Sequence, residues 1–126
     1  LGLVSVVAPA LAGGSTVVVV AAQERPLPAI TLGEVLATSD VPGGVVNILT
    51  GRTAELAPWL ASHADVNAID LAGVVGDLAT ELEVAAADNV KRVLRPDDTA
   101  KWTETPDTKR LRHYLETKTV WHPAGR

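Results

Sequence analysis

The chain has no cysteine, no methionine and no phenylalanine among its 126 residues. Without cysteine it can form no disulfide bond, no thiolate metal site and no thiol nucleophile. It also has no excess of positive charge, because 11 lysines and arginines stand against 15 acidic residues, for a net charge of −4. That balance provides no electrostatic attraction for nucleic acid or for an anionic membrane. We therefore expect neither as a partner.

Long apolar runs are also absent. The opening residues 1–11 are apolar, but Pro9 interrupts them and Gly13 and Gly14 follow, so the run is too short to span a bilayer and is better explained as a buried helix. No basic residues precede the run, as they would in a signal peptide, and we expect a cytoplasmic protein. Because the chain begins at Leu1 and has no methionine, we expect it to be a piece of a longer protein.

The chain is instead rich in aliphatic residues. Hydrophobic residues make up 47% of the composition, whereas aromatic residues make up only 3%. A valine-rich core that is poor in phenylalanine suits buried parallel strands covered by helices. The four consecutive valines Val17–Val20 disfavour a helix and predict a strand that is buried on both faces.

The remaining pattern alternates between the two element types. We expect helices over 1–12, 29–38, 53–63 and 78–86, and strands within 15–22, 45–49, 68–71 and 90–94. Pro28 suits a first helical turn, and Thr53 is placed to N-cap its helix. Short connections between alternating strands and helices predict an α/β fold: a Rossmann-like parallel sheet with flanking helices.

Three segments follow from the change in composition along the chain. We expect a Rossmann-like domain over 1–96, a polar linker over 97–105, and a C-terminal helix and arm over 106–126. The helix would begin at Pro106. Residues 116–121 alternate as a strand does, yet no hairpin turn supplies a partner. We expect the segment from Thr117 to Trp121 to pair with another element or another chain.

Several polar residues are candidates for chemistry. His63, His113 and His122 are scattered without metal-ligand spacing, and His63 lies where an imidazole can meet the last carbonyls of a helix. Asp65 and Asp70 are more typical of edge or capping acids than of a catalytic pair.

Two further groups lie near the C-terminus. The basic cluster of Lys109, Arg110 and Arg112 suits a solvated helix face. Trp102 and Trp121 flank the arm, and we expect them to anchor it against an apolar surface.

Five short segments, taken in order, resemble one family. Residues 8–19 (APALAGGSTVVV) resemble APALAAGNTVVVKP, residues 42–51 (PGGVVNILTG) resemble PPGVVNVVTG, and residues 63–69 (HADVNAI) resemble HPDVDKI. Residues 89–93 (NVKRV) are similar to NLKRV, and residues 115–120 (LETKTV) are similar to YTEVKTV. These motifs are those of the nucleotide-binding half and C-terminal tail of aldehyde dehydrogenases.

The resemblance implies a domain that binds NAD or NADP and an arm that pairs across a subunit boundary. The family holds the adenosine ribose with Lys and Glu, where this chain has Val20 and Gln23. Gly51 closes the second matched segment. The family holds the pyrophosphate with a Thr-Gly-Ser loop at a helix N-terminus, where this chain has Gly73 followed by Val74. These five positions are the candidate coenzyme-binding residues, in a degenerate form.

The family's catalytic residues have no counterpart. Its general base is a Glu in a LELGG strand, but here Val93 is followed by Leu94, Arg95 and Pro96, and the nucleophilic Cys is missing. We therefore expect no aldehyde oxidation by this chain alone. The first hypothesis is a non-catalytic structural or oligomerising subunit, forming homo- or hetero-oligomers. The alternatives are a fragment or subunit of an NAD(P)-dependent aldehyde dehydrogenase with its catalytic residues elsewhere, and a weak dinucleotide-binding module.

Overall fold

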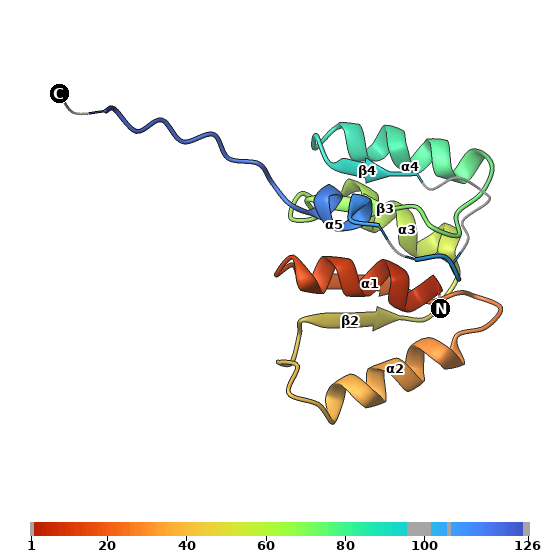
Figure 1. The fold of residues 1–126 in the computed structure, drawn as a ribbon. Coiled ribbons are helices and arrows are strands. Elements are labelled where there is room, and N and C mark those ends of the chain that lie inside the picture. The colour runs from red at the N-terminus through yellow and green to blue at the C-terminus, as the bar shows by residue number, and fades with distance from the viewer. Residues whose placement is uncertain (1, 96–101, 106, 125–126) are drawn as a thin grey trace.

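The computed structural model describes residues 2–95, 102–105 and 107–124. Helices and strands alternate through the first of these ranges (Figure 1). The elements are α1 (Gly2–Ala12), β1 (Val17–Val20), α2 (Leu27–Ala37), β2 (Val46–Leu49), α3 (Thr53–Ser62), β3 (Ala68–Asp70), α4 (Asp77–Ala87), β4 (Arg92–Leu94) and α5 (Lys109–Tyr114). The order agrees with the predicted one, and the predicted bounds agree to within a few residues.

The strands pair in parallel, as the alternation predicted. Val17 of β1 stands opposite Val46 of β2, and Ala68 of β3 stands opposite Arg92 of β4. Within the described residues these pairs form two separate two-stranded sheets, not the single sheet that the sequence suggested. The arrows of β2 and β4 point the same way in Figure 1, so the carboxyl ends of both sheets lie on one side of the molecule.

Backbone hydrogen bonds show which edge of β1 and of β3 is paired. The amide of Val17 donates to the carbonyl of Val45, and the amide of Ala21 donates to that of Leu49, so this edge of β1 faces β2. On β3, the amide of Leu71 donates to the carbonyl of Leu94, so this edge faces β4. Alternate amides of a strand point to opposite edges. In the described residues no strand pairing joins the other edges of β1 and β3.

Glycine and proline set the helix boundaries. Gly14 has φ of 80°, and its amide donates to the carbonyl of Leu11, which ends α1 in the left-handed conformation that glycine tolerates best. Pro28 lies in the first turn of α2, as predicted. The prediction for Thr53 is wrong. The helix already begins at that residue, and Arg52 takes the cap position without a side-chain hydrogen bond.

The main buried cluster lies in the second half of the body. Three of its five members are alanines, which let α3 and α4 approach each other closely. Leu82 of α4 is the largest fully buried side chain among the described residues. The cluster comprises Ala57, Ala61, Leu71, Ala79 and Leu82.

The C-terminal part differs most from expectation. Pro106, the predicted helix start, and residues 97–101 of the predicted linker lie outside the described residues. The short α5 begins at Lys109, and from Leu115 the chain runs outward as an extended arm (Figure 1). The segment from Thr117 to Trp121 is not paired as a strand in this single chain, because a strand needs a partner edge to form its hydrogen bonds.

In the described part of the chain, no helix combines the length and the apolar character that crossing a membrane requires.

Candidate functional site

The five candidate coenzyme positions all lie at or after the carboxyl end of a strand. Val20 is the last residue of β1, Gly51 comes two residues after β2, and Gly73 and Val74 follow β3. Ligands of open parallel α/β sheets bind at such ends, where successive loops face one another. The topology therefore places the candidate residues on the side of the molecule that suits dinucleotide binding.

The end of β1 has little polarity to offer. Val20 is half-buried and stands opposite Leu49 in the register with β2. Its aliphatic side chain cannot bond a ribose hydroxyl, and leaving such a hydroxyl desolvated without a partner costs about 1–3 kcal/mol. Gln23 is exposed, and its amide nitrogen donates to the carboxylate of the neighbouring Glu24 at 3.4 Å. Of the two candidate residues at the end of β1, Gln23 is therefore the one whose side chain can form a hydrogen bond to a ribose hydroxyl.

Two glycines retain a backbone that a side chain would disturb. A Cβ added at Gly51 would lie 3.0 Å from Cδ1 of Leu56, so a larger residue would push into α3. Gly73 has φ of 84°, a conformation that glycine adopts without strain, and the space around it is open. The loop after β3 therefore still permits close approach of a ligand to the backbone.

Val74 packs against the hydrophobic core. Its side chain packs against the buried cluster described above, and its amide donates to the carbonyl of Leu71 at 3.0 Å. The side chain that replaces the family's serine is thus partly buried beneath the loop. An apolar side chain in this position stabilises the α3–α4 packing and offers no donor to a phosphate.

The N-terminus of α4 carries an unfavourable charge for an anionic ligand. Gly76 occupies the cap position with φ of 67°, and Asp77 is the first helical residue. Asp77 and Glu81 contribute to the lining of a shallow hollow along this helix. A helix N-terminus attracts anions through its free amides and its dipole, but the carboxylate of Asp77 already stands there. The fit for a dinucleotide is therefore mixed: the backbone suits it and the side chains do not.

A buried ion pair lies beside this loop. Oδ1 of Asp70 accepts the amide of Ala72 at 2.9 Å, which confirms the predicted capping role. Oδ2 of Asp70 accepts Nε of Arg110 and the hydroxyl of Tyr114, each at 2.7 Å. The Asp70 side chain is 5% exposed and that of Arg110 is 18% exposed. Trp102 contacts the other side of this group, with its ring 5.2 Å from the Arg110 guanidinium carbon.

The solvated-face prediction is wrong for Arg110 and correct for Lys109 and Arg112, which are exposed. Arg110 and Tyr114 are four positions apart, so they project from the same face of α5. Both reach the same carboxylate on β3. The spacing was visible in the sequence, but nothing in the sequence linked it to Asp70.

The surroundings of α5 shift three pKa values. Burial together with the hydrogen bond to Asp70 raises the pKa of Tyr114 far above its ordinary value, so the phenol remains a donor. Burial works to lower the pKa of Arg110, but the hydrogen bond and charge of Asp70 outweigh it and the pKa is raised. Burial lowers the pKa of His113. His113 is therefore neutral at pH 7, and its buried Nε2 has no partner among the described atoms.

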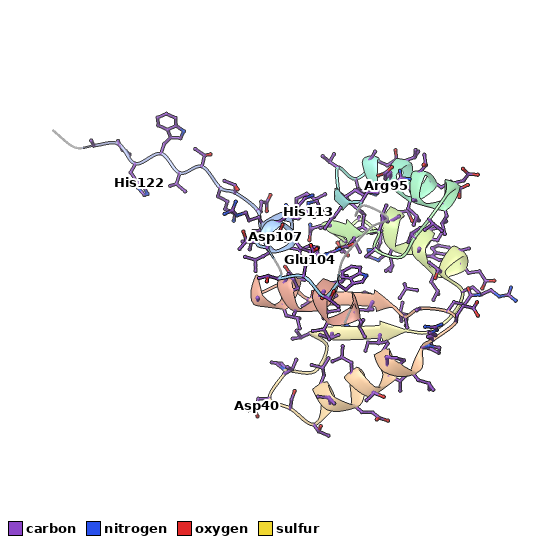
Figure 2. All side chains as sticks on the ribbon, turned by 45° about the vertical axis from the view of Figure 1, so that its right-hand side comes forward. Asp40, Arg95, Glu104, Asp107, His113 and His122 are labelled. Atoms are coloured by element: carbon purple, nitrogen blue, oxygen red, sulfur yellow. The ribbon has the colours of Figure 1, made fainter. Side chains whose placement is uncertain are left out.

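The other histidines have separate surroundings. Nδ1 of His63 accepts the amide of Asp65 at 3.2 Å, and the backbone carbonyl of His63 accepts Nζ of Lys91. The imidazole thus caps a turn rather than the helix carbonyls. Figure 2 shows His122 far out on the arm, whereas His113 lies on α5 against the body. Among the residues that the structure describes, no group of histidines and acids is arranged to hold a metal ion.

The two tryptophans that flank the arm behave differently. A Cβ added at Gly2 of α1 would lie 3.4 Å from the ring of Trp102, so this ring packs against the start of α1. Trp102 therefore anchors the region before α5 to the body. Trp121 is 89% exposed, and its predicted anchoring surface stays a prediction.

Comparison with known proteins bears on the same part of the chain. The sequence model described as "Aldehyde dehydrogenase family" matches residues 2–95. A protein of Leishmania tarentolae named "Aldehyde dehydrogenase, mitochondrial" is 40% identical over 85 residues, which is 68% of this chain and 17% of that protein. "2-hydroxymuconic semialdehyde dehydrogenase" of Pseudomonas putida is 42% identical over 88 residues, which is 69% of this chain and 18% of that protein.

A third relative, "Aldehyde dehydrogenase 1" of Tanacetum cinerariifolium, is 36% identical over 87 residues, or 69% of this chain and 17% of that protein. The matched region thus spans about a sixth of the length of these curated relatives. No solved structure matches the chain.

Proposed function

Because this chain belongs to the aldehyde dehydrogenase family, we propose that it is the coenzyme-binding portion of an NAD(P)-dependent aldehyde dehydrogenase, whose catalytic residues lie elsewhere. The observation that carries the proposal is the extent of the family match. It runs through all four strands and both candidate glycine loops. The strand ends of that region lie on one side of the molecule, where dinucleotides bind in folds of this kind.

The side chains of this chain explain why we assign it coenzyme binding and place the catalytic residues elsewhere. Aldehyde oxidation in this family needs a thiolate and a carboxylate base, and the chain contains no cysteine. Val93 of β4 is followed by Leu94 and Arg95, so no carboxylate stands where the resemblance would place the base. NAD or NADP, when bound, supplies the hydride acceptor. The residues of this chain bind and orient the coenzyme and carry out no covalent step.

We expect that binding to be weak. The side chain of Val20 cannot form a hydrogen bond to the ribose, and that of Val74 cannot form one to the pyrophosphate. The carboxylate of Asp77 repels the phosphates. Each lost or opposed contact costs on the order of 1 kcal/mol, so the three together raise the dissociation constant on the order of a hundredfold above that of a site that makes all three contacts.

Calorimetric titration of the purified chain with NAD, NADP and ADP tests the proposal. Heat of binding for at least one dinucleotide at millimolar concentration is the expected result, and a complete lack of heat would overturn it. The same chain mixed with an aldehyde and NAD should produce no NADH. Production of NADH would show that this chain contains its own catalytic groups, which would contradict the proposal.

A second candidate function, a structural or oligomerising role, is favoured by the arm. Residues 115–124 are exposed, and Val120 and Trp121 retain 66% and 89% of their surface. We propose that the segment from Thr117 to Trp121 pairs as a strand with a second copy or with a different subunit. The exposed backbone of an extended segment bonds to water, and it exchanges those bonds for strand pairing in such a contact.

Sedimentation velocity of the chain over a range of concentrations tests the homo-oligomer. A Val120→Thr, Trp121→Ser variant should dissociate, whereas Trp59→Ser, which changes another exposed tryptophan, on α3, should not. A wild-type chain that stays monomeric at every concentration would exclude the homo-oligomer. Co-purification with a full-length aldehyde dehydrogenase that depends on the arm would then support the hetero-oligomer.

A further inference from the structure

Helix α5 bridges the two halves of the body, which share no strand pairing in the described residues. On one side it packs against α1, where the Leu115 side chain closely approaches Gly13. On the other side it contacts β4 and bonds to β3. Since α1 leads into β1, the bridge connects the β1–β2 half to the β3–β4 half.

The attachment of α5 to β3 is polar. No residue of α5 is fully buried, and the bonds to the second half converge on the carboxylate of Asp70. Arg110 and Tyr114 donate to it across 40 and 44 positions of sequence. Charge-assisted hydrogen bonds of this kind have a fixed geometry and are stronger than neutral ones. These bonds join α5 to β3 through one side chain, beside the packing of α5 against β4 and α1.

The same carboxylate also holds the candidate phosphate loop. Oδ1 of Asp70 accepts the amide of Ala72, the residue immediately before Gly73. Asp70 thus ties together the loop after β3 and the helix that reaches across to α1. A dinucleotide has to contact both that loop and the end of β1, which belong to different sheets.

We propose that Asp70 is a positioning residue for dinucleotide binding, which sets the Gly73 loop at the correct separation from the end of β1 through Arg110 and Tyr114 of α5. This inference rests on the proposed coenzyme function. It assigns to the C-terminal segment a part in the coenzyme site, although α5 lies beyond residues 2–95, which match the family. Asp70 acts through the loop and the helix and is not itself a contact for the ligand.

The test compares a ligand that spans both halves with one that needs only the first. Tyr114→Phe removes one hydrogen bond to Asp70 and leaves the Asp70–Ala72 turn in place. Asp70→Asn changes all of the contacts. We expect Tyr114→Phe to weaken NAD binding by up to about tenfold, the full effect of one lost hydrogen bond to a charged group, and Asp70→Asn to weaken it further. Both variants should leave the affinity for adenosine unchanged. Ser39→Ala, which removes an exposed hydrogen bond to the carbonyl of Leu36 at the end of α2, is the matched control.

The ratio of NAD affinity to adenosine affinity decides the question, because a loss of stability alone would lower both affinities together. An unchanged ratio in Tyr114→Phe would overturn the positioning role while leaving the coenzyme function intact. A wild-type chain that binds neither ligand would overturn the proposed function and this inference with it. Should Asp70→Asn fail to fold, Tyr114→Phe still gives the result.

Discussion

Replacing Asp77 with Asn should tighten dinucleotide binding while it slightly destabilises the fold. Asp77 is exposed and stands in the first turn of α4, immediately after Gly76. Its carboxylate interacts favourably with the helix dipole, and at an exposed site this is worth about 0.3–1 kcal/mol. The same carboxylate occupies the field that a pyrophosphate would use. The substitution therefore changes stability and affinity in opposite directions.

The size of both effects follows from one interaction. The free energy of unfolding should fall by about 0.3–1 kcal/mol when the charge is removed, measured by urea denaturation. The dissociation constant for NAD should fall about two- to fivefold, because the repulsion that is relieved acts at the same place and has a similar magnitude. The gain should shrink as salt is added, since exposed charges are screened.

Calorimetric titration of wild type and Asp77→Asn at low and high salt measures the affinity. Asp88→Asn is the control, because it neutralises an acid beyond the opposite end of α4. Equal affinities for wild type and Asp77→Asn at low salt would refute the reasoning, since they would place the phosphates away from the N-terminus of α4. Adenosine, which has no phosphate, should bind both proteins equally well.

Three other substitutions test the fold and its pH dependence. Leu82→Ala should lower the free energy of unfolding by about 2–5 kcal/mol, because Leu82 is only 1% exposed. Val84→Ala, on the outer face of α4, should change it little. Equal losses of stability in urea denaturation would contradict the observed core. Gly73→Ala should lower the free energy of unfolding by about 1 kcal/mol, because alanine is strained at the φ of 84° even though the space around Gly73 is open, and it should weaken NAD binding. An unchanged melting temperature would show that the loop adopts another conformation. Burial lowers the pKa of His113 below its ordinary 6.5. The unfolded chain then binds a proton first, so stability should be full above about pH 6.5 and decline as the pH falls toward the folded pKa. His113 faces Asp70, Arg92 and Arg110, and His113→Asn should flatten this decline, so an identical pH profile for the variant would assign the decline to another group.

Much of the candidate coenzyme region could be predicted because its signals are local. Four consecutive valines favour a strand through their own branching, Gly14 ends a helix through its own backbone freedom, and short motifs in a fixed order indicate the family. The resemblance therefore indicated candidate positions at the ends of the first three strands, and these stay predictions. The charge at the start of α4 was not identified, because the significance of Asp77 appears only once the helix boundary is known.

The sequence by itself determined the order of helices and strands and the parallel pairing, because these depend on side-chain branching, hydrophobic periodicity and short connections. Only the tertiary structure decided that the strands form two sheets, that Val74 serves the core, and that Asp70 binds α5. Arg110 and Tyr114 lie 40 and 44 positions from Asp70. No local rule can bring such residues together, because the contact exists only after packing has placed α5 against β3 and removed the carboxylate from water.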